Sequence, residues 1–422
     1  MARFQQFPYF VALSHKLVLG VSVYLGAMFR LAVLVAALLA SLVLAGASVA
    51  GGGPDPHLGY GKDVKHARAL GYCDAFAGRE PRMRACLVRQ LLALVTASHD
   101  PANEVPRIDR YAHASGGFLE GNCHILMHTV GRRYGAQRHV TLARLWHFLP
   151  RSNDPGCSAG FAHGLMTFLG PQIVVAGPKG VAAQCARAPT RYERYSCIHG
   201  LGHAYARLFL EHIDLGLEAC GKLGPANAPD CAQGVYHDYW IAISGLDNAR
   251  RPANASTSPR AICSRAPRAY VRGCWYRAWL ERPPSAPVSS AARILALCRG
   301  LATVQHAGCV TGASLITSSD PFQQLGICSG LRSIAAIACV RGVRVGGVAL
   351  SPLGQQVDLV RRCASIVAAA QHGCYFWLGK TLAVITNGRF GDTGCTRLAF
   401  AATRDHCRLG ARSYEGPLET FS

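Results

Sequence analysis

The chain is long and apolar enough to bury a sizeable core, and its net charge is strongly positive. It has 422 residues, of which 50% are hydrophobic and 16% charged, a composition that excludes an intrinsically disordered chain. Its 44 lysines and arginines give a formal net charge of +21, which favours anionic partners such as a membrane surface or a cell-wall polymer. Nucleic acid is disfavoured, because the basic residues are scattered and no nucleic-acid-binding module is recognisable.

The N-terminal 50 residues predict export. Residues 31–44 are apolar, Arg30 precedes them, and Ser48-Val49-Ala50 has the small residues of a signal-peptide cleavage site, so that Met28 would be the true start. Left uncleaved, residues 31–50 form a stretch of about 20 residues, enough to span a bilayer as an anchor. Both alternatives, signal peptide and membrane anchor, place the remainder outside the cytoplasm, after a Gly/Pro linker at residues 51–61.

The cysteines indicate the same compartment and suggest how they pair. Eighteen cysteines would be hard to keep reduced in the cytosol, whereas an oxidising environment can pair them all. Most fall into pairs with ten to twelve intervening residues. These are Cys73–Cys86, Cys185–Cys197, Cys220–Cys231, Cys263–Cys274, Cys298–Cys309, Cys328–Cys339, Cys363–Cys374 and Cys395–Cys407. Cys123 and Cys157 fall outside this pattern and are left to pair with each other or to ligate a metal.

Each cysteine pair has the same surroundings, which predict a helical hairpin. An apolar helical stretch ends near the first cysteine, and the second cysteine opens another, often as Cys-x-x-Gly. A disulfide there would staple two antiparallel helices, and closing each small loop contributes about 3 kcal/mol. One hairpin cannot bury its apolar face alone, so we expect neighbouring hairpins to stack.

We therefore predict an all-α fold, a solenoid-like array of disulfide-stapled helical hairpins. Histidine-rich repeats occupy residues 62–245, further stapled repeats occupy residues 246–410, and residues 411–422 form a polar tail. Residues 281–290 are rich in proline and are expected to form a surface loop.

Two resemblances accompany this pattern. The repeat length near 34 residues resembles that of tetratricopeptide-like repeats, in architecture only, because the tetratricopeptide consensus is absent. The motifs Cys-His-x-x-x-His at residues 123–128, Cys-x-x-Gly-x-x-His-Gly at 157–164 and Cys-x-His-Gly-x-Gly-His at 197–203 resemble those of exported bacterial proteins without an established activity. These resemblances imply a helical solenoid and export, and they imply no mechanism.

The histidines of the N-terminal half repeat at one position. Three histidines stand six residues after a cysteine: His163 after Cys157, His203 after Cys197 and His237 after Cys231. His128 stands five residues after Cys123, which is one residue early. His199 and His203 are four residues apart, so in a helix they share a face, with Cβ atoms about 5–6 Å apart. Because packed helices lie about 8–10 Å apart, histidines at one position in neighbouring repeats can meet over a shared ion.

We hypothesise a metal site, or a pair of sites, formed by these histidines. Its ligands are His124, His128, His163, His199, His203 and His237. Ligation by imidazole alone suits zinc, copper or iron better than calcium or magnesium. The alternative is that these histidines are packed, hydrogen-bonded structural side chains.

The sequence leaves open whether the protein is an enzyme. The His-Glu-x-x-His arrangement of zinc proteases is absent. The weak catalytic candidates are Glu120, Asp238 and Tyr236, and Asp238 could instead orient a histidine from behind. The competing class of function is a metal-free scaffold whose basic surface docks on an anionic membrane or cell-wall polymer, with the C-terminal repeats free to bind a protein partner.

Overall fold

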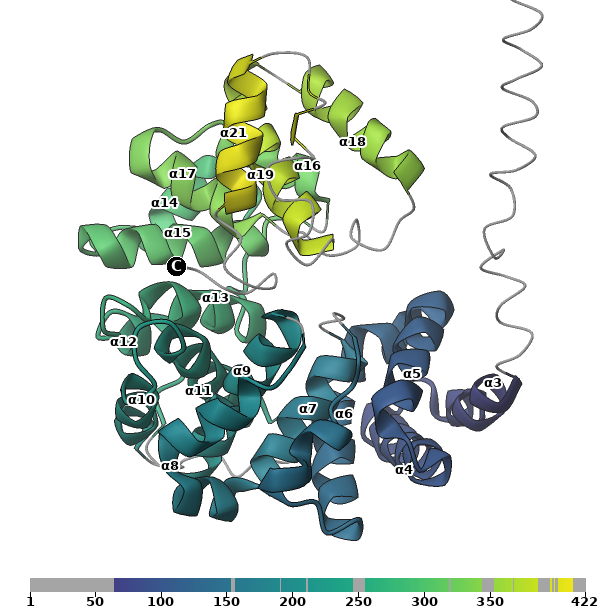
Figure 1. Cartoon of the computed structure of the whole chain (residues 1–422). Helices are drawn as coiled ribbons and strands as arrows, with labels where there is room; N and C mark the ends of the chain where they lie inside the picture. The colour runs from purple at the N-terminus through teal and green to yellow at the C-terminus, as the bar shows by residue number, and fades with distance from the viewer. Residues whose placement is uncertain are drawn as a thin grey trace, which may run out of the picture. The chain divides into compact units, whose positions relative to one another are not determined.

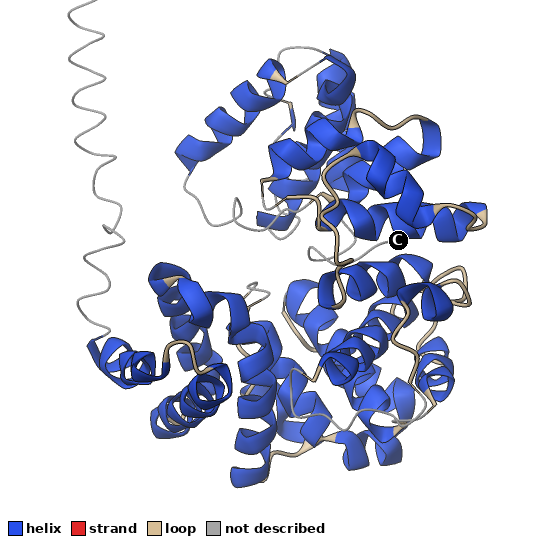
Figure 2. Cartoon of the chain, turned by 180° about the vertical axis from the view of Figure 1, so that it is seen from behind, coloured by secondary structure: helices blue, strands red, loops and turns tan. Residues whose placement is uncertain are grey.

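The computed structural model describes residues 64–152, 156–189, 191–209, 212–245, 255–318, 320–343, 353–366, 368–385, 395–396, 398 and 401–412. Within those ranges the regular elements are helices and there is no strand (Figure 2), which confirms the all-α class. The chain divides into two compact units at residues 65 and 66, and the elements below belong almost entirely to the second. The predicted leader, the start at Met28, the linker and most of the polar tail lie outside the described residues.

The first part of the described chain contains five α-helices and two 3₁₀ helices. They are α3 (Val64–Gly71), η1 (Tyr72–Phe76), α4 (Glu80–Ser98), α5 (Pro101–Ser115), α6 (Gly117–Gln137), η2 (Leu142–His147) and α7 (Cys157–Phe168). Their apolar faces are buried in one core that includes Leu91, Val105, Met127 and Leu165.

From α8 onward the chain alternates between a helix that ends at or near the first cysteine of a pair and one that carries the second. The pairs are α8 (Gly170–Cys185) with α9 (Arg191–Leu208), α10 (Ile213–Gly221) with α11 (Ala228–Ser244), α12 (Pro259–Cys263) with α13 (Val271–Glu281), α14 (Ala291–Cys298) with α15 (Thr303–Leu315), α16 (Pro321–Cys328) with α17 (Ser333–Gly342), and α18 (Leu353–Ser365) with α19 (Ala368–Ile385). Cys395 precedes α21 (Ala401–Arg412) in the same way.

Several of the short first helices begin at a capping side chain. Ser258, Ser290 and Asp320 each accept a hydrogen bond from a backbone N–H in the first turn of α12, α14 and α16. Proline follows at the first position of α12 and α16, where its missing N–H costs no helical hydrogen bond. These caps let helices of only five to eight residues start at a defined point.

All eighteen cysteines form disulfides, and the eight pairs expected from spacing are confirmed. Cys123 pairs with Cys157 and joins α6 to α7 across 34 residues. That bond leaves neither sulfur available as a thiolate ligand, so these two cysteines serve as a staple. Nine intramolecular disulfides indicate an oxidising, extracytoplasmic environment.

The helices that carry the second cysteines pack side by side in sequence order. α6 contacts α7, α7 contacts α9, and the row continues through α11, α13, α15, α17, α19 and α21 (Figure 1). The shorter first helices flank this row, each held to its partner by a disulfide. Side chains buried along the later part of the row include Trp240, Trp275 and Trp377. The array of stapled hairpins therefore places equivalent helices next to one another.

No single helix among the described residues is long and apolar enough to cross a membrane. α7 and α8 together meet the length and composition of a span, but they are bent by 98° at the break between them. Both helices contribute to the buried core, with Leu165 and Ile173 fully covered.

Candidate metal centre

The six histidines selected from the sequence lie on four helices of the central row. α6 carries His124 and His128, α7 carries His163, α9 carries His199 and His203, and α11 carries His237. Five of the side chains are buried, with exposed fractions of 2% or less, and His124 is half-buried. The fold therefore gathers side chains that are up to 113 residues apart in one place, with His124 nearest to solvent.

The glycines of the cysteine motifs allow the four helices to approach closely. A Cβ atom on Gly160 would lie 2.1 Å from the backbone oxygen of His124, and one on Gly164 would lie 2.2 Å from that of His128. Any side chain at either position would push α7 away from α6. The same helices are joined by the Cys123–Cys157 disulfide. The motif glycines thus set the distance between the imidazoles of α6 and α7.

α9 and α11 cross through a second pair of glycines. A Cβ on Gly234 would lie 1.9 Å from the oxygen of His199, and one on Gly202 would lie 2.0 Å from the oxygen of Cys231. The two glycine Cα atoms face each other at the crossing. His199 and His203 flank Gly202 on α9, while His237 is one turn beyond Gly234 on α11. This contact brings the three imidazoles together.

The six rings form one contiguous cluster. Ring centroids of contacting pairs are between 4.7 and 6.5 Å apart, and His163 lies 4.7 Å from both His199 and His203. The stacking predicted from the shared position therefore does bring these rings together. Whether they bind a metal remains a prediction.

Three ring nitrogens converge at the spacing that a metal requires. His237 Nδ1 lies 3.2 Å from His199 Nε2 and 3.1 Å from His203 Nε2. Zinc–nitrogen bonds of about 2.0–2.1 Å in tetrahedral geometry put neighbouring ligand nitrogens about 3.3 Å apart. One ligand atom from each of His163, His199, His203 and His237 can be chosen so that all lie within 4.8 Å of one another. The donor set fits a four-coordinate ion.

The opposite nitrogen of each converging ring has its own partner. His203 Nδ1 lies 3.2 Å from Asp238 Oδ1, and His237 Nε2 lies 3.3 Å from Glu281 Oε1. His199 Nδ1 lies 3.2 Å from the hydroxyl of Tyr195, which itself donates to the side-chain oxygen of Gln233. Asp238 and Tyr195 favour a hydrogen on the outward nitrogens of His203 and His199 and a lone pair on the inward ones. The outward nitrogen of His237 lies between Glu281, an acceptor, and Arg277, a donor at 3.3 Å.

The remaining three histidines form an adjoining group. Nε2 of His124 and Nε2 of His128 are 3.1 Å apart, and His163 supplies a third nitrogen within 4.8 Å of both. Nδ1 of His163 is buried and has no hydrogen-bond partner among the described residues. A buried lone nitrogen without a partner is costly, and a metal ion would satisfy it.

Burial sets the protonation state of these rings. It lowers the pKa of His128, His163, His199 and His237 well below the ordinary value of 6.5. Burial also lowers the pKa of His203, although the hydrogen bond to Asp238 and the charge of that carboxylate oppose the shift. The rings are therefore neutral at pH 7, which is the form that ligates metals.

Charged side chains border the cluster on two sides. Asp238 Oδ2 lies 2.5 Å from Arg207 Nε. Burial raises the pKa of Asp238, but Arg207 and His203 together lower it by more. The net shift is downward, and the group is a carboxylate. Arg277, 1% exposed, places Nη1 3.3 Å from His237 Nε2 and Nη2 3.5 Å from His199 Nε2.

The three catalytic candidates have different positions. Asp238 contacts the cluster through His203, as expected of an orienting carboxylate. Glu120 is exposed, and its Oε1 lies 3.4 Å from Nδ1 of His113. Tyr236 is buried, which raises the pKa of its hydroxyl, and it lines a cavity between α10 and α12 that contains none of the six histidines. Of the three, Asp238 is the one with a hydrogen-bond contact to a cluster histidine in the described structure.

Sequence reasoning missed the partners contributed by α13. Residues 281–290 were expected to form a loop, but Glu281 is the last residue of α13 and its carboxylate contacts His237. Arg277 was not selected at all. One signal existed: it stands three residues after Cys274, where glycine follows Cys157, Cys197 and Cys231 at the same distance. In those three repeats this position is a glycine that lies where two helices cross. An arginine at the same position therefore marks a departure from the repeat.

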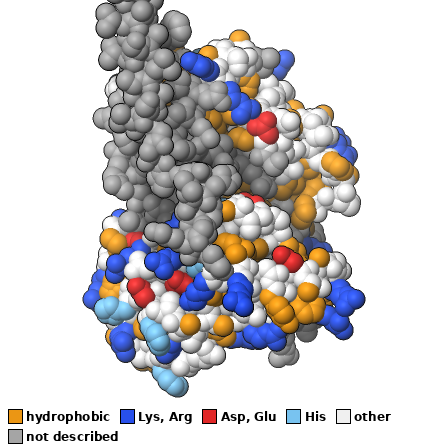
Figure 3. Space-filling model, turned by 90° about the vertical axis from the view of Figure 1, so that its right-hand side faces the viewer, with side chains coloured by type: hydrophobic (Ala, Val, Ile, Leu, Met, Phe, Trp, Pro, Cys, Tyr) orange, Lys and Arg blue, Asp and Glu red, His pale blue; other side chains and the backbone are white. Residues whose placement is uncertain are grey.

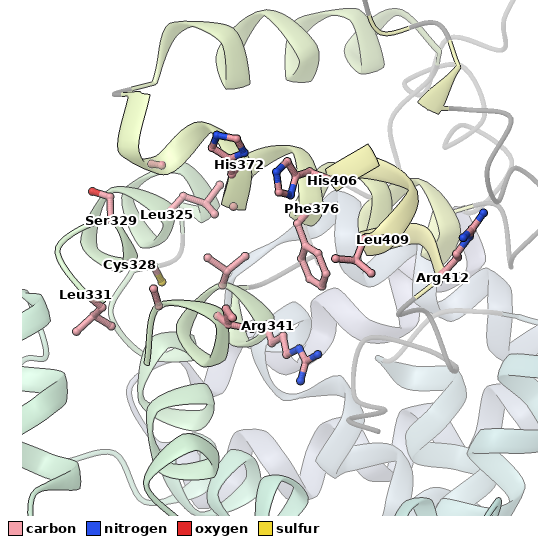
Figure 4. Close-up of a pocket in the computed structure, with 15 residues that line it drawn as sticks. Leu325, Cys328, Ser329, Leu331, Arg341, His372, Phe376, His406, Leu409 and Arg412 are labelled. Atoms are coloured by element: carbon pink, nitrogen blue, oxygen red, sulfur yellow. The ribbon is translucent and has the colours of Figure 1, made fainter. Parts of the chain in front are cut away.

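A second apolar cavity lies in the C-terminal half of the described chain. It has a volume of about 610 Å³ between α16, α17, α19 and α21, and His372 and His406 line it, with ring centroids 4.3 Å apart (Figure 4). None of the six clustered histidines lines it. Among the described residues no third potential metal ligand groups with this histidine pair, which serves as a comparison for the cluster.

No protein-family model, curated protein or solved structure matches this chain. The tetratricopeptide-like resemblance is thus supported only in its coarse form, as an all-helical architecture with many disulfides. Fold and site together define an extracytoplasmic, disulfide-stapled helical protein with a buried histidine cluster of metal-binding geometry.

Proposed function

We propose that this protein is an exported metal-binding protein whose N-terminal half holds zinc, copper or iron in the six-histidine cluster. The observation that carries the proposal is the convergence of His199 Nε2, His203 Nε2 and His237 Nδ1 at 3.1–3.2 Å. With hydrogens on the outward nitrogens, three lone pairs face one another. A cation among them replaces this repulsion with coordination.

The remaining histidines complete the coordination or hold a second ion. His163 is within reach of both groups, as a fourth ligand to His199, His203 and His237 or as a third to His124 and His128. The metal would supply Lewis acidity or electron transfer, according to the ion bound. The chain fixes the rings and keeps them neutral. One disulfide joins α6 to α7, and two others hold α9 and α11 to their flanking helices.

Metal analysis of the full chain purified without an affinity tag tests this proposal. We expect at least one zinc, copper or iron ion per chain, and loss of that metal in a variant with both His199→Ala and His203→Ala. Replacing the comparison pair, His372→Ala with His406→Ala, removes the same number of imidazoles and should leave the metal in place. Retention of metal by the first variant would show that the converging nitrogens are not its ligands.

The carboxylates that contact the outward ring nitrogens give a second prediction, a partial loss of metal affinity. Asp238→Asn and Glu281→Gln keep the shape of each side chain but remove the negative charge beside a cluster histidine. We expect each change to lower metal affinity by about 10- to 100-fold, the usual effect of replacing such a partner. Competition with a chelator at pH 7 measures it. The exposed Glu218→Gln on α10 is the control, and an equal effect of all three changes would contradict the assignment.

A folded protein that never takes up metal would favour the second candidate, a scaffold. The support for it is the net charge of +21 and the lysine and arginine side chains spread over the face seen in Figure 3. In that case the basic surface would dock on an anionic membrane or cell-wall polymer, and the C-terminal repeats would bind a protein partner.

A further inference from the structure

The charged groups that border the cluster balance one another before a metal is added. Among the described residues, Asp238 is paired with Arg207, and Glu281 and Arg277 contact His237 with opposite charges. The five fully buried imidazoles are neutral. A divalent ion therefore brings two positive charges that no bordering group offsets. Burying an uncompensated charge is costly, so a metal-loaded centre should recruit an anion.

Arg277 stands where that anion would bind. Its Nη2 lies 3.5 Å from His199 Nε2, one of the converging nitrogens, and its Nη1 lies 3.3 Å from His237 Nε2, the outward nitrogen of that ring. Once His199 Nε2 coordinates a metal, it can no longer accept a hydrogen bond from the guanidinium. The planar guanidinium has N–H groups at the spacing of two oxygens of one ligand, which is why arginine binds carboxylates and other oxyanions.

We propose that the metal centre takes a small oxyanion as its exogenous ligand, with one oxygen on the metal and a second on Arg277. This inference rests on the proposed function and adds the chemical class of the molecule that the centre binds. Arg277 is then a ligand-binding residue. A carboxylate and an inorganic oxyanion such as phosphate share this chemistry, and the two are separated by titration.

The test uses the full chain loaded with cobalt(II), whose visible spectrum reports changes in its ligands. Formate and inorganic phosphate are titrated separately into the wild type and into Arg277→Gln. We expect a saturable spectral change in the wild type with at least one of the two anions. In Arg277→Gln the affinity should fall by about 10- to 100-fold, as for loss of a charged hydrogen bond. Cobalt stoichiometry should be unchanged, because Arg277 is not a metal ligand.

Two further variants sharpen the result. Arg277→Lys keeps the charge and should retain part of the affinity, and Arg282→Gln removes the same charge five residues along and should bind the anion like the wild type. Equal anion affinity in the wild type and Arg277→Gln would overturn the proposal, as would a cobalt-loaded wild type that responds to neither anion. If Arg277→Gln fails to fold, the wild-type and Arg277→Lys titrations decide. A wild type that binds no cobalt contradicts the proposed function itself.

Discussion

Replacing Gly234 with alanine is expected to destabilise the protein by about 3 kcal/mol or more and to abolish metal binding. The added methyl group would lie 1.9 Å from the backbone oxygen of His199, which is a rigid atom that cannot rotate aside. α9 and α11 would have to separate, and His199, His203 and His237 would separate with them. Urea unfolding with the disulfides intact, together with metal analysis, measures both effects.

Gly121→Ala is the matched control for this change. Gly121 lies inside α6 and is exposed, and nothing is within 4 Å of the position that its Cβ would take. Alanine there should leave stability unchanged or raise it by up to about 1 kcal/mol, because it restricts the unfolded chain. If Gly234→Ala unfolded at the same urea concentration as Gly121→Ala, the glycine crossing would not control the cluster.

The metal-free protein is expected to lose stability steeply as the pH falls below 6.5. Burial lowers the pKa of five clustered histidines, so below pH 6.5 the unfolded chain takes up protons that the folded chain does not. Stability therefore rises with pH in this window and is lost as the pH falls. Each such histidine contributes up to about 1.4 kcal/mol per pH unit.

Urea unfolding in the presence of a chelator, from pH 8 to pH 5.5, measures this dependence. Stability should change little above pH 7, where both folded and unfolded imidazoles are neutral. The window lies above that of Asp238, whose lowered pKa makes its contribution fail only at more acid pH. The His372→Ala and His406→Ala variant should keep most of the wild-type slope and lose only the share of His406, whose pKa burial also lowers. A flat profile between pH 7 and pH 5.5 would contradict neutral burial of the cluster.

The disulfides show how far local spacing can predict structure. Eight pairs followed from cysteines separated by one turn between two apolar stretches, and that regularity also indicated helical hairpins. Cys123 and Cys157 are 34 residues apart, so their pairing could not be separated from metal ligation by spacing alone. The contact between α6 and α7 decided it.

The histidine cluster shows the limit of the same reasoning. A shared position after the cysteine selected His163, His203 and His237, because one position in stacked repeats faces one direction. Nothing in that position distinguishes which ring nitrogen points inward. Asp238 decides this for His203 and Tyr195 decides it for His199, and Tyr195 was not selected from the sequence.

Local regularities of this sequence, cysteine spacing, apolar helical stretches and repeated Cys-x-x-Gly, determined the helical class, the staples and the set of six histidines. They could do so because each depends on residues within one or two helical turns. The tertiary structure alone decided that the six rings meet, that glycines face each other at the α9–α11 crossing, and that α13 brings Arg277 and Glu281 to the cluster. These contacts join residues from separate repeats, and the distance between them depends on how the helices pack rather than on any local pattern.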